Sequence, residues 1–185
     1  MMQRVVTFLI LLTVIIAAKT ASSEEIIGPE VVFNGSSARV SLTLTLTEEQ
    51  ITSIREGLQK ELVFYVDLFR KWHVWPDEFI RGKKLTRTLN ANIVKGEFKV
   101  VSVDETTILE KRFSSFDSML RWALRIRDIQ ISLSELQEDG IYFIRITIES
   151  IKQKPPQFYS YVLFFVDDKD FKIKKDTEEF KIKLR

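Results

Sequence analysis

The stretch ARVSLTLTLT, residues 38–47, decides the fold class. Valine and leucine occupy every second position from Val40 to Leu46, and serine and threonine occupy the positions between them. Successive side chains of a β-strand point to opposite faces, so this period predicts a strand with one face in the core and one at the surface. The same period dominates the chain from Val31 onward, which indicates a mainly β protein.

Turn signals separate the predicted strands. Asn34-Gly35 predicts a first hairpin, because both residues tolerate a positive φ. Lys95-Gly96 predicts a second hairpin between two alternating segments, KLTRTLNANIV and EFKVVSV. A further alternating strand, IYFIRITIES, follows an Asp-Gly pair and is expected to point Tyr142, Ile144, Ile146 and Ile148 to one face.

Two other segments are apolar on both faces. ELVFYVDLFR, residues 61–70, is interrupted only by Asp67, so we expect a central strand that is covered on both sides. FYSYVLFFV, residues 158–166, follows Pro155-Pro156 and is very aromatic. If that strand lies at an edge it can pair with a partner strand, and if it is central it belongs to the core.

Helix signals occur twice. Thr47 and Gln50 have the spacing of a capping box, which predicts a short helix over residues 48–56. A second such pattern, beginning at Ser114, precedes FDSMLRWALRIRD, residues 116–128, whose apolar residues recur at helical spacing. This second segment is the predicted main helix.

These elements predict one architecture. About eight strands, a main helix and a short helix are expected, and the β-α-β alternation of a parallel sheet is absent from the sequence. An antiparallel β-sandwich fits this pattern. The chain of 185 residues is long enough for one such domain, which we expect to span residues 25–185.

The first residues resemble an export signal. Arg4 is followed by an uncharged run from Val5 to Ala18 and then by small and polar residues. A helix of that run would reach roughly 21 Å, which is short of the ~30 Å hydrocarbon core of a membrane. We therefore expect residues 1–22 to be a signal peptide cleaved between Ala18 and Ser23, the alternative being an uncleaved N-terminal anchor. Either outcome predicts a periplasmic or secreted domain, tethered to the inner membrane if the leader is retained.

Composition narrows the choice of partners. The chain has no cysteine, so its stability cannot depend on disulfides. Removal of residues 1–22 takes away two of 28 basic residues and no acid, which leaves 26 basic against 26 acidic residues. Nucleic-acid binding normally needs a strong positive excess, so nucleic acid is not expected as a partner.

The segment KWHVWPDE, residues 71–78, is the richest in functional groups. Trp72, Trp75, Asp77 and Glu78 are the candidate binding residues, since exposed indole faces can stack on a sugar, a peptide or a lipid headgroup. The alternative is that the two tryptophans plug one open end of the sandwich.

Catalysis is not expected from this segment. His73 is the only histidine of the chain, there is no cysteine, and no serine lies in a Gly-x-Ser-x-Gly elbow. A triad or a zinc site rich in histidine therefore lacks its components. Three carboxylates between Asp167 and Asp170 resemble calcium ligands, but the loop lacks the glycine and distal glutamate of an EF-hand. A solvated turn is expected there, and neither a metal nor a cofactor is predicted.

Basic residues gather near the predicted main helix. They are Lys111, Arg112, Arg121, Arg125 and Arg127. A basic, aromatic helix can contact anionic lipid headgroups or an acidic partner, which makes Arg121 and Arg125 a candidate basic surface. Ordinary solvent-facing charges explain the same pattern.

The order of these segments resembles a known family. The segments that carry the resemblance are an exported leader, threonine-rich first strands, ELVFYVDLFR, the W-x-x-W-P-D-E stretch, LTRTLNANIVKGEFKV, FDSMLRWALRIRDI and YFIRITIE. Together they resemble a bacterial family described as domain of unknown function 4390 (DUF4390), over about residues 25–184. The resemblance implies an exported protein of bacteria with a two-membrane envelope and supplies no catalytic residue. In that family, aromatic residues precede acidic ones in the segment that matches residues 72–78, as they do here. His73 is a local departure from that pattern.

The sequence therefore favours a non-enzymatic cell-envelope domain. Its expected partner is an envelope protein, a peptide or a glycan, bound at residues 72–78 or along an open strand edge. Membrane contact is expected only through a retained leader. The alternatives are a periplasmic hydrolase or carbohydrate-active enzyme with a carboxylate pair, and a structural accessory of a membrane complex.

Overall fold

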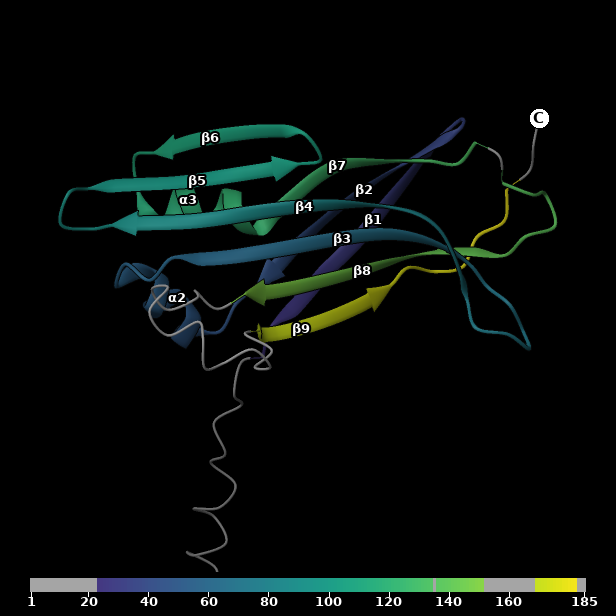
Figure 1. The fold of residues 1–185 in the computed structure, drawn as a ribbon, viewed down its shortest axis with the longest axis horizontal. Helices are drawn as coiled ribbons and strands as arrows, with labels where there is room; N and C mark the ends of the chain where they lie inside the picture. The colour runs from purple at the N-terminus through teal and green to yellow at the C-terminus, as the bar shows by residue number, and fades with distance from the viewer. Residues whose placement is uncertain (1–22, 135, 152–168, 183–185) are drawn as a thin grey trace, which may run out of the picture.

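The computed structural model describes residues 23–134, 136–151 and 169–182, and their strands form two antiparallel sheets (Figure 1). The smaller sheet has the order β1-β2-β7 and consists of β1 (Glu25–Asn34), β2 (Ser37–Thr45) and β7 (Arg125–Ser132). The larger sheet has the order β6-β5-β4-β3-β8-β9 and consists of β3 (Lys60–Arg70), β4 (Glu78–Asn92), β5 (Glu97–Asp104), β6 (Thr107–Phe113), β8 (Tyr142–Ile151) and β9 (Lys169–Asp176). The described helices are α2 (Glu48–Arg55) and α3 (Phe116–Leu124).

The expected fold class is confirmed. The described residues form nine strands, against about eight expected, with one short helix and one main helix. Figure 1 shows the smaller sheet crossing one face of the larger sheet, with α3 beside it under β4 and β5. The core lies between these layers.

The apolar faces of the strands meet in this core. Val40, Leu42 and Leu44 of β2 are at most 4% exposed, as the alternation in residues 38–47 predicts. The inner side chains of β3, Leu62, Phe64, Val66 and Leu68, are fully buried. Burying each such side chain contributes roughly 1.5–3 kcal/mol, so these facing rows supply most of the cohesion between the sheets.

The central position of β3 is confirmed, and its outer face is covered only in part: Val63 is buried there. β3 pairs with β4 on one side and β8 on the other. Tyr65 and Asp67, on its outer face, are partly exposed. Long side chains cover part of that face in place of a second layer: the Lys84 Nζ lies 5.9 Å from the Tyr65 ring centroid.

Both predicted hairpins are present, and the first turn lies one residue further along the chain than predicted. β1 and β2 are joined through Gly35, whose φ is +56°, and Asn34 pairs with Ser37, so the tip is Gly35-Ser36. The predicted turn is therefore displaced by one residue. β4 and β5 are joined through a turn that ends at Gly96, with a φ of +65°.

The predicted short helix is confirmed with its cap. In α2 the Thr47 Oγ1 accepts a hydrogen bond from the Gln50 amide at 3.3 Å, and the Gln50 Oε1 accepts one from the Thr47 amide at 3.1 Å. Both halves of the capping box are present.

The predicted main helix is too long. α3 begins after Ser115, not Ser114, because the Ser115 side chain accepts from the Ser118 amide. It ends at Leu124, and Arg125 and Arg127, which were expected on the helix, belong to β7. The cause is a bulge: Asp128 has a φ of +56° and the pairing with β2 shifts register there. The bulge sets the inner side chains of Ile126 and Ile129 three positions apart, a spacing that resembles a helix.

Some predicted features lie outside the described residues. They are the leader (residues 1–22), the aromatic segment (158–166), the two prolines (155–156) and the first part of the acidic turn (167–168). In the described part of the chain, neither helix has the length and apolar character needed to cross a membrane.

Candidate functional site

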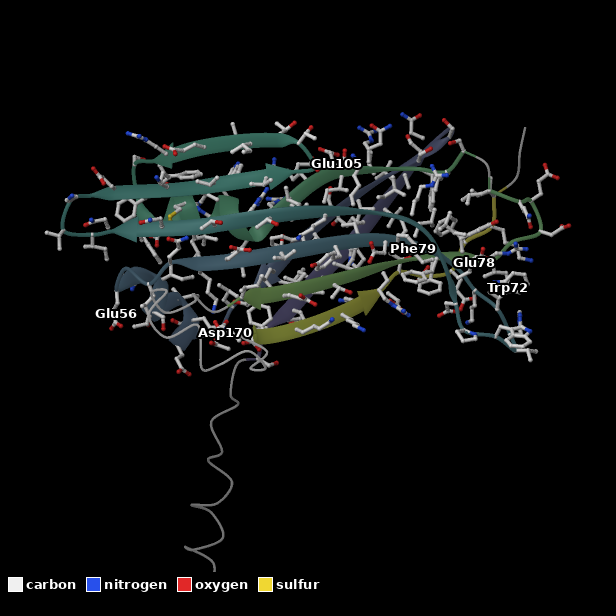
Figure 2. The ribbon with its side chains drawn as sticks, in the orientation of Figure 1. Glu56, Trp72, Glu78, Phe79, Glu105 and Asp170 are labelled. Carbon is white, nitrogen blue, oxygen red and sulfur yellow. The ribbon has the colours of Figure 1, made fainter. Side chains whose placement is uncertain are left out.

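The Trp-rich segment forms the tip of the β3–β4 hairpin. β3 ends at Arg70, β4 begins at Glu78, and these two residues are paired across the base of the loop. Figure 1 shows this hairpin extending past the end of the neighbouring strands, and Figure 2 shows Trp72 on its protruding part, beyond Phe79. The candidate binding residues are therefore on one protruding loop.

The tryptophans do not plug the sandwich. Trp75 is 74% exposed, Val74 is 87% exposed and Trp72 is 41% exposed. Phe79, at the base of the loop, is 57% exposed as well. Large apolar side chains that gather at one exposed place mark an interaction surface more often than scattered ones do. We call Trp72, Val74, Trp75 and Phe79 the hairpin tip.

Side-chain contacts hold the Trp72 ring in place. The Trp72 Nε1 donates a hydrogen bond to the Glu78 Oε2 at 3.2 Å. The Arg70 guanidinium lies 4.3 Å from the centroid of the Trp72 ring, a cation–π contact. These contacts orient one indole before any partner arrives, which reduces the entropy lost on binding.

The base of the hairpin is tied to the sheet. Arg145 of β8 forms a double hydrogen bond with Asp176 of β9, at 2.8 Å for each nitrogen–oxygen pair, and lies 3.8 Å from the Asp77 carboxylate. Its guanidinium also lies 4.9 Å from the Phe69 ring centroid. The loop residue Lys71 pairs with Glu179 beyond β9, and this contact raises the pKa of Lys71.

One carboxyl near this base has a perturbed pKa. Burial of Asp67 raises the pKa of its side chain, and the charge of Arg145 opposes that shift. Asp67 pairs with Gly82 of β4, where a Cβ atom would come within 2.0 Å of the Asp67 Oδ1. The close approach of this carboxyl to the neighbouring backbone explains a glycine inside a strand.

The acids of the loop are engaged with protein groups. Glu78 accepts from Trp72, and Asp77 faces Arg145. His73 is exposed on the same loop. Among the described residues, no group of three histidine, aspartate or glutamate side chains is arranged to hold a metal ion. The exposed indoles of Trp72 and Trp75 and the exposed Val74 offer surfaces for stacking and apolar contact.

A second candidate surface lies beside α3. It is a groove of about 930 Å³ between α3, β6 and the start of β7. Six of its lining side chains are cationic and none is acidic. The cations are Arg87, Lys111, Arg112, Arg121, Arg125 and Arg127. The structure thus brings together the five basic residues identified from the sequence, although two of them lie on β7 and not on the helix. We call this cavity the basic groove.

The sequence analysis missed the residue that organises the basic groove. Arg87 of β4 is only 7% exposed, and its Nη1 donates to the carbonyl oxygens of Trp122, Ala123 and Arg125, at 2.5, 3.0 and 2.9 Å. These are the carbonyls that the end of α3 leaves without helical partners. Its guanidinium lies 4.2 Å from the Trp122 ring centroid. Burial lowers the pKa of Arg87 to about 10.

A signal for Arg87 was present in the sequence. It occupies the core-facing row of β4, between Leu85 and Leu89. A charged side chain in such a row needs polar or charged partners, because burying a charge without compensation is costly. Such a residue therefore marks either a structural contact or a functional site. The missed residue therefore stood out by its position in the period of two.

Comparisons with known proteins give a family and no closer relative. Residues 29–179 match the family model described as Domain of unknown function (DUF4390), which covers most of the chain. No curated protein and no solved structure matches. Most of the segments noted in the sequence lie within these residues, and the chain belongs to the DUF4390 family.

Proposed function

We propose that this protein is an exported cell-envelope module that binds a protein or peptide partner through the hairpin tip and does not act as an enzyme. The observation that carries the proposal is the exposure of Trp75 and Val74, at 74% and 87%, on a loop whose base is fixed. Tryptophan is enriched among the residues that dominate binding energy at protein interfaces.

The composition around the tip agrees with a protein interface. Apolar side chains occupy its centre, while Arg70, Lys71, Asp77 and Glu78 lie around them. A centre of aromatic residues with a charged rim is the usual anatomy of such an interface. The tip protrudes (Figure 1), so it suits insertion into a groove of the partner.

A protein partner fits the tip better than a glycan does. Sugar binding combines an aromatic platform with polar groups that point at the ligand. Here the Glu78 carboxylate accepts from Trp72 and the Asp77 carboxylate faces Arg145, so both acids serve the loop itself. The same engagement argues against their use as a hydrolytic carboxylate pair.

Affinity capture from the native envelope tests this proposal. Wild type is compared with Trp72→Ala, with Trp75→Ala and with Val94→Ala, the last at the opposite β4–β5 turn, where Val94 is 98% exposed. The expected result is one partner recovered by wild type and by Val94→Ala, and lost with either tryptophan variant. Recovery of the same partner by all four proteins would contradict the proposal.

The export part has its own test. The intact mass of the protein isolated from the envelope is expected to correspond to cleavage between Ala18 and Ser23. A measured mass that still includes residues 1–22 would show that the leader is kept as an anchor and is not a cleaved signal. Recovery of the protein only from the cytosol would contradict export.

A further inference from the structure

The basic groove has a helix as one wall. Ser118 and Arg121 of α3 line it three residues apart, which places them on the same side of the helix, and Ser114 and Arg125 line it just beyond the two ends of α3. The nine residues of α3 span about 14 Å at 1.5 Å per residue. The groove is thus an elongated surface and not a point site.

The other wall is an open edge strand. β6 is the last strand of the larger sheet and pairs only with β5 among the described strands. All its residues from Thr107 to Arg112 are exposed, and Ile108 is 72% exposed. The outer edge of such a strand presents unpaired amide and carbonyl groups, which another extended chain can pair with.

Most of the charges along the groove lack a carboxylate partner among the described residues; the exception is Arg112, whose Nε donates to the Glu110 Oε1 at 3.2 Å. Arg121, Arg125 and Arg127 form no ion pair with any described residue, and no lining residue is acidic. Arg87 is 7% exposed, and its Nε is buried without a hydrogen-bond acceptor in the described structure. The Lys111 Nζ lies 5.2 Å from the centroid of the Trp122 ring and forms no ion pair with a described residue. The groove is therefore complementary to a polyanion.

We propose that the basic groove binds an acidic segment of a partner protein, which adds to the edge of β6 as an extra strand. Lys111 and Phe113, two residues apart on β6, line the basic groove, and Leu109 lines the adjoining cavity, which Asp104 and Asp128 also line. A strand paired with β6 alternates in the same way, so every second side chain of the segment faces the arginines. Four to five residues of an extended chain cover about 14 Å, and their acids stand at alternate positions.

This surface is separate from the hairpin tip. The tip lies at one end of the long strands, and α3 lies toward the other end (Figure 1). Binding in the groove does not require the tip, so each proposal can be tested and rejected without affecting the other. In the envelope, one molecule would then hold two partners at the same time.

A defined peptide tests the proposal on the purified protein. The probe is a fluorescent, blocked peptide of sequence Thr-Glu-Thr-Glu-Thr-Glu-Thr, and binding is measured by fluorescence anisotropy. The matched control peptide has lysine in place of each glutamate. Two further peptides carry N-methyl groups, one on the glutamate amides and one on the threonine amides. In a paired strand only alternate residues direct their amides to the neighbour, so methylation of one set blocks pairing and methylation of the other does not.

The expected results are specific. The acidic peptide binds, the lysine peptide does not, and only one of the two methylated peptides loses affinity, by about tenfold or more. The double change Arg121→Ala, Arg125→Ala lowers affinity for the acidic peptide by at least about tenfold. Arg39→Ala, which removes an exposed arginine of β2 outside the groove, changes it less than about twofold.

Several results would overturn the proposal. Equal binding of both methylated peptides would mean that charge alone acts, without strand pairing. Unchanged affinity in the double arginine variant would place the site elsewhere. The acidic peptide could fail to bind while anionic lipid vesicles or pyrophosphate bind in a way that depends on Arg121 and Arg125. That result would show that the groove binds phosphate groups and not an acidic peptide. Because the exchanged arginines are exposed, the variants are expected to keep the circular dichroism spectrum of wild type.

Discussion

Single residues of the same type have opposite roles according to their position. Phe64 of β3 is fully buried between the sheets, whereas Trp75 is 74% exposed at the hairpin tip. A buried ring stabilises the fold through the apolar surface that it removes from water. An exposed ring adds little to stability, so its position at the tip agrees with the proposed role in binding.

A pair of substitutions separates these roles. Phe64→Ala is expected to lower the free energy of unfolding by about 3–5 kcal/mol. Trp75→Ala is expected to change it by less than about 0.5 kcal/mol. Urea unfolding of both variants checks this. A large drop in the free energy of unfolding of Trp75→Ala would mean that the indole supports the fold. Loss of partner binding in that variant could then be explained by its lower stability.

Asp67 gives a prediction on pH. Burial raises the pKa of its carboxyl in the folded state above the ordinary value of 3.8. The folded protein therefore binds this proton more tightly than the unfolded chain, and the contribution of Asp67 to stability falls as the pH rises through its folded pKa. Asp67→Asn is expected to be more stable than wild type at pH 7, with a difference that vanishes near pH 3. Urea unfolding at both values measures it, and a difference that grows toward pH 3 would contradict the sign.

At the scale of elements, α2 shows how a local signal fixes a boundary. Both hydrogen bonds of its capping box are present, at 3.3 and 3.1 Å. Thr47→Ala removes the side-chain acceptor and is expected to lower the free energy of unfolding by about 1 kcal/mol. Thr52→Ala, an exposed change on the same helix, is the control and is expected to be neutral or slightly stabilising. Equal losses in the two variants would show that the cap contributes nothing.

The elements also show where the sequence misleads. The alternation of β2 and the caps of α2 are local patterns, and both predicted the structure correctly. The boundary between α3 and β7 was predicted wrongly, because the bulge at Asp128 makes a strand look helical over a few residues. Only the pairing of β7 with β2, which joins distant parts of the chain, decides that boundary.

At the scale of the whole molecule, the candidate sites differ in how far the sequence revealed them. Trp72 and Trp75 of the hairpin tip lie in one short segment, so they were identified together, whereas Val74 and Phe79 were recognised only from their exposure. The basic groove combines β4, β6, α3 and β7, and Arg87 enters it from about 35 residues away in sequence, as its bond to Trp122 shows. Helical periodicity found part of this surface, but the topology was needed to bring Arg87 to the end of α3.

Two surfaces on one fold suggest how the molecule works as a whole. The sandwich keeps the hairpin tip at one end of its long strands and the basic groove toward the other. The tip is apolar and aromatic, while the groove is cationic, so the two proposals assign them different kinds of partner. The central claim remains the first of these, that the hairpin tip docks on an envelope protein.

Site-specific photo-cross-linking in the native envelope tests that claim most directly. A benzoylphenylalanine replaces Trp75 in one variant and Val94, on the opposite turn, in the other. The account predicts a discrete protein adduct from position 75 and none from position 94. Adducts of the same mass from both positions, or adducts at position 75 to lipid or glycan only, would contradict it.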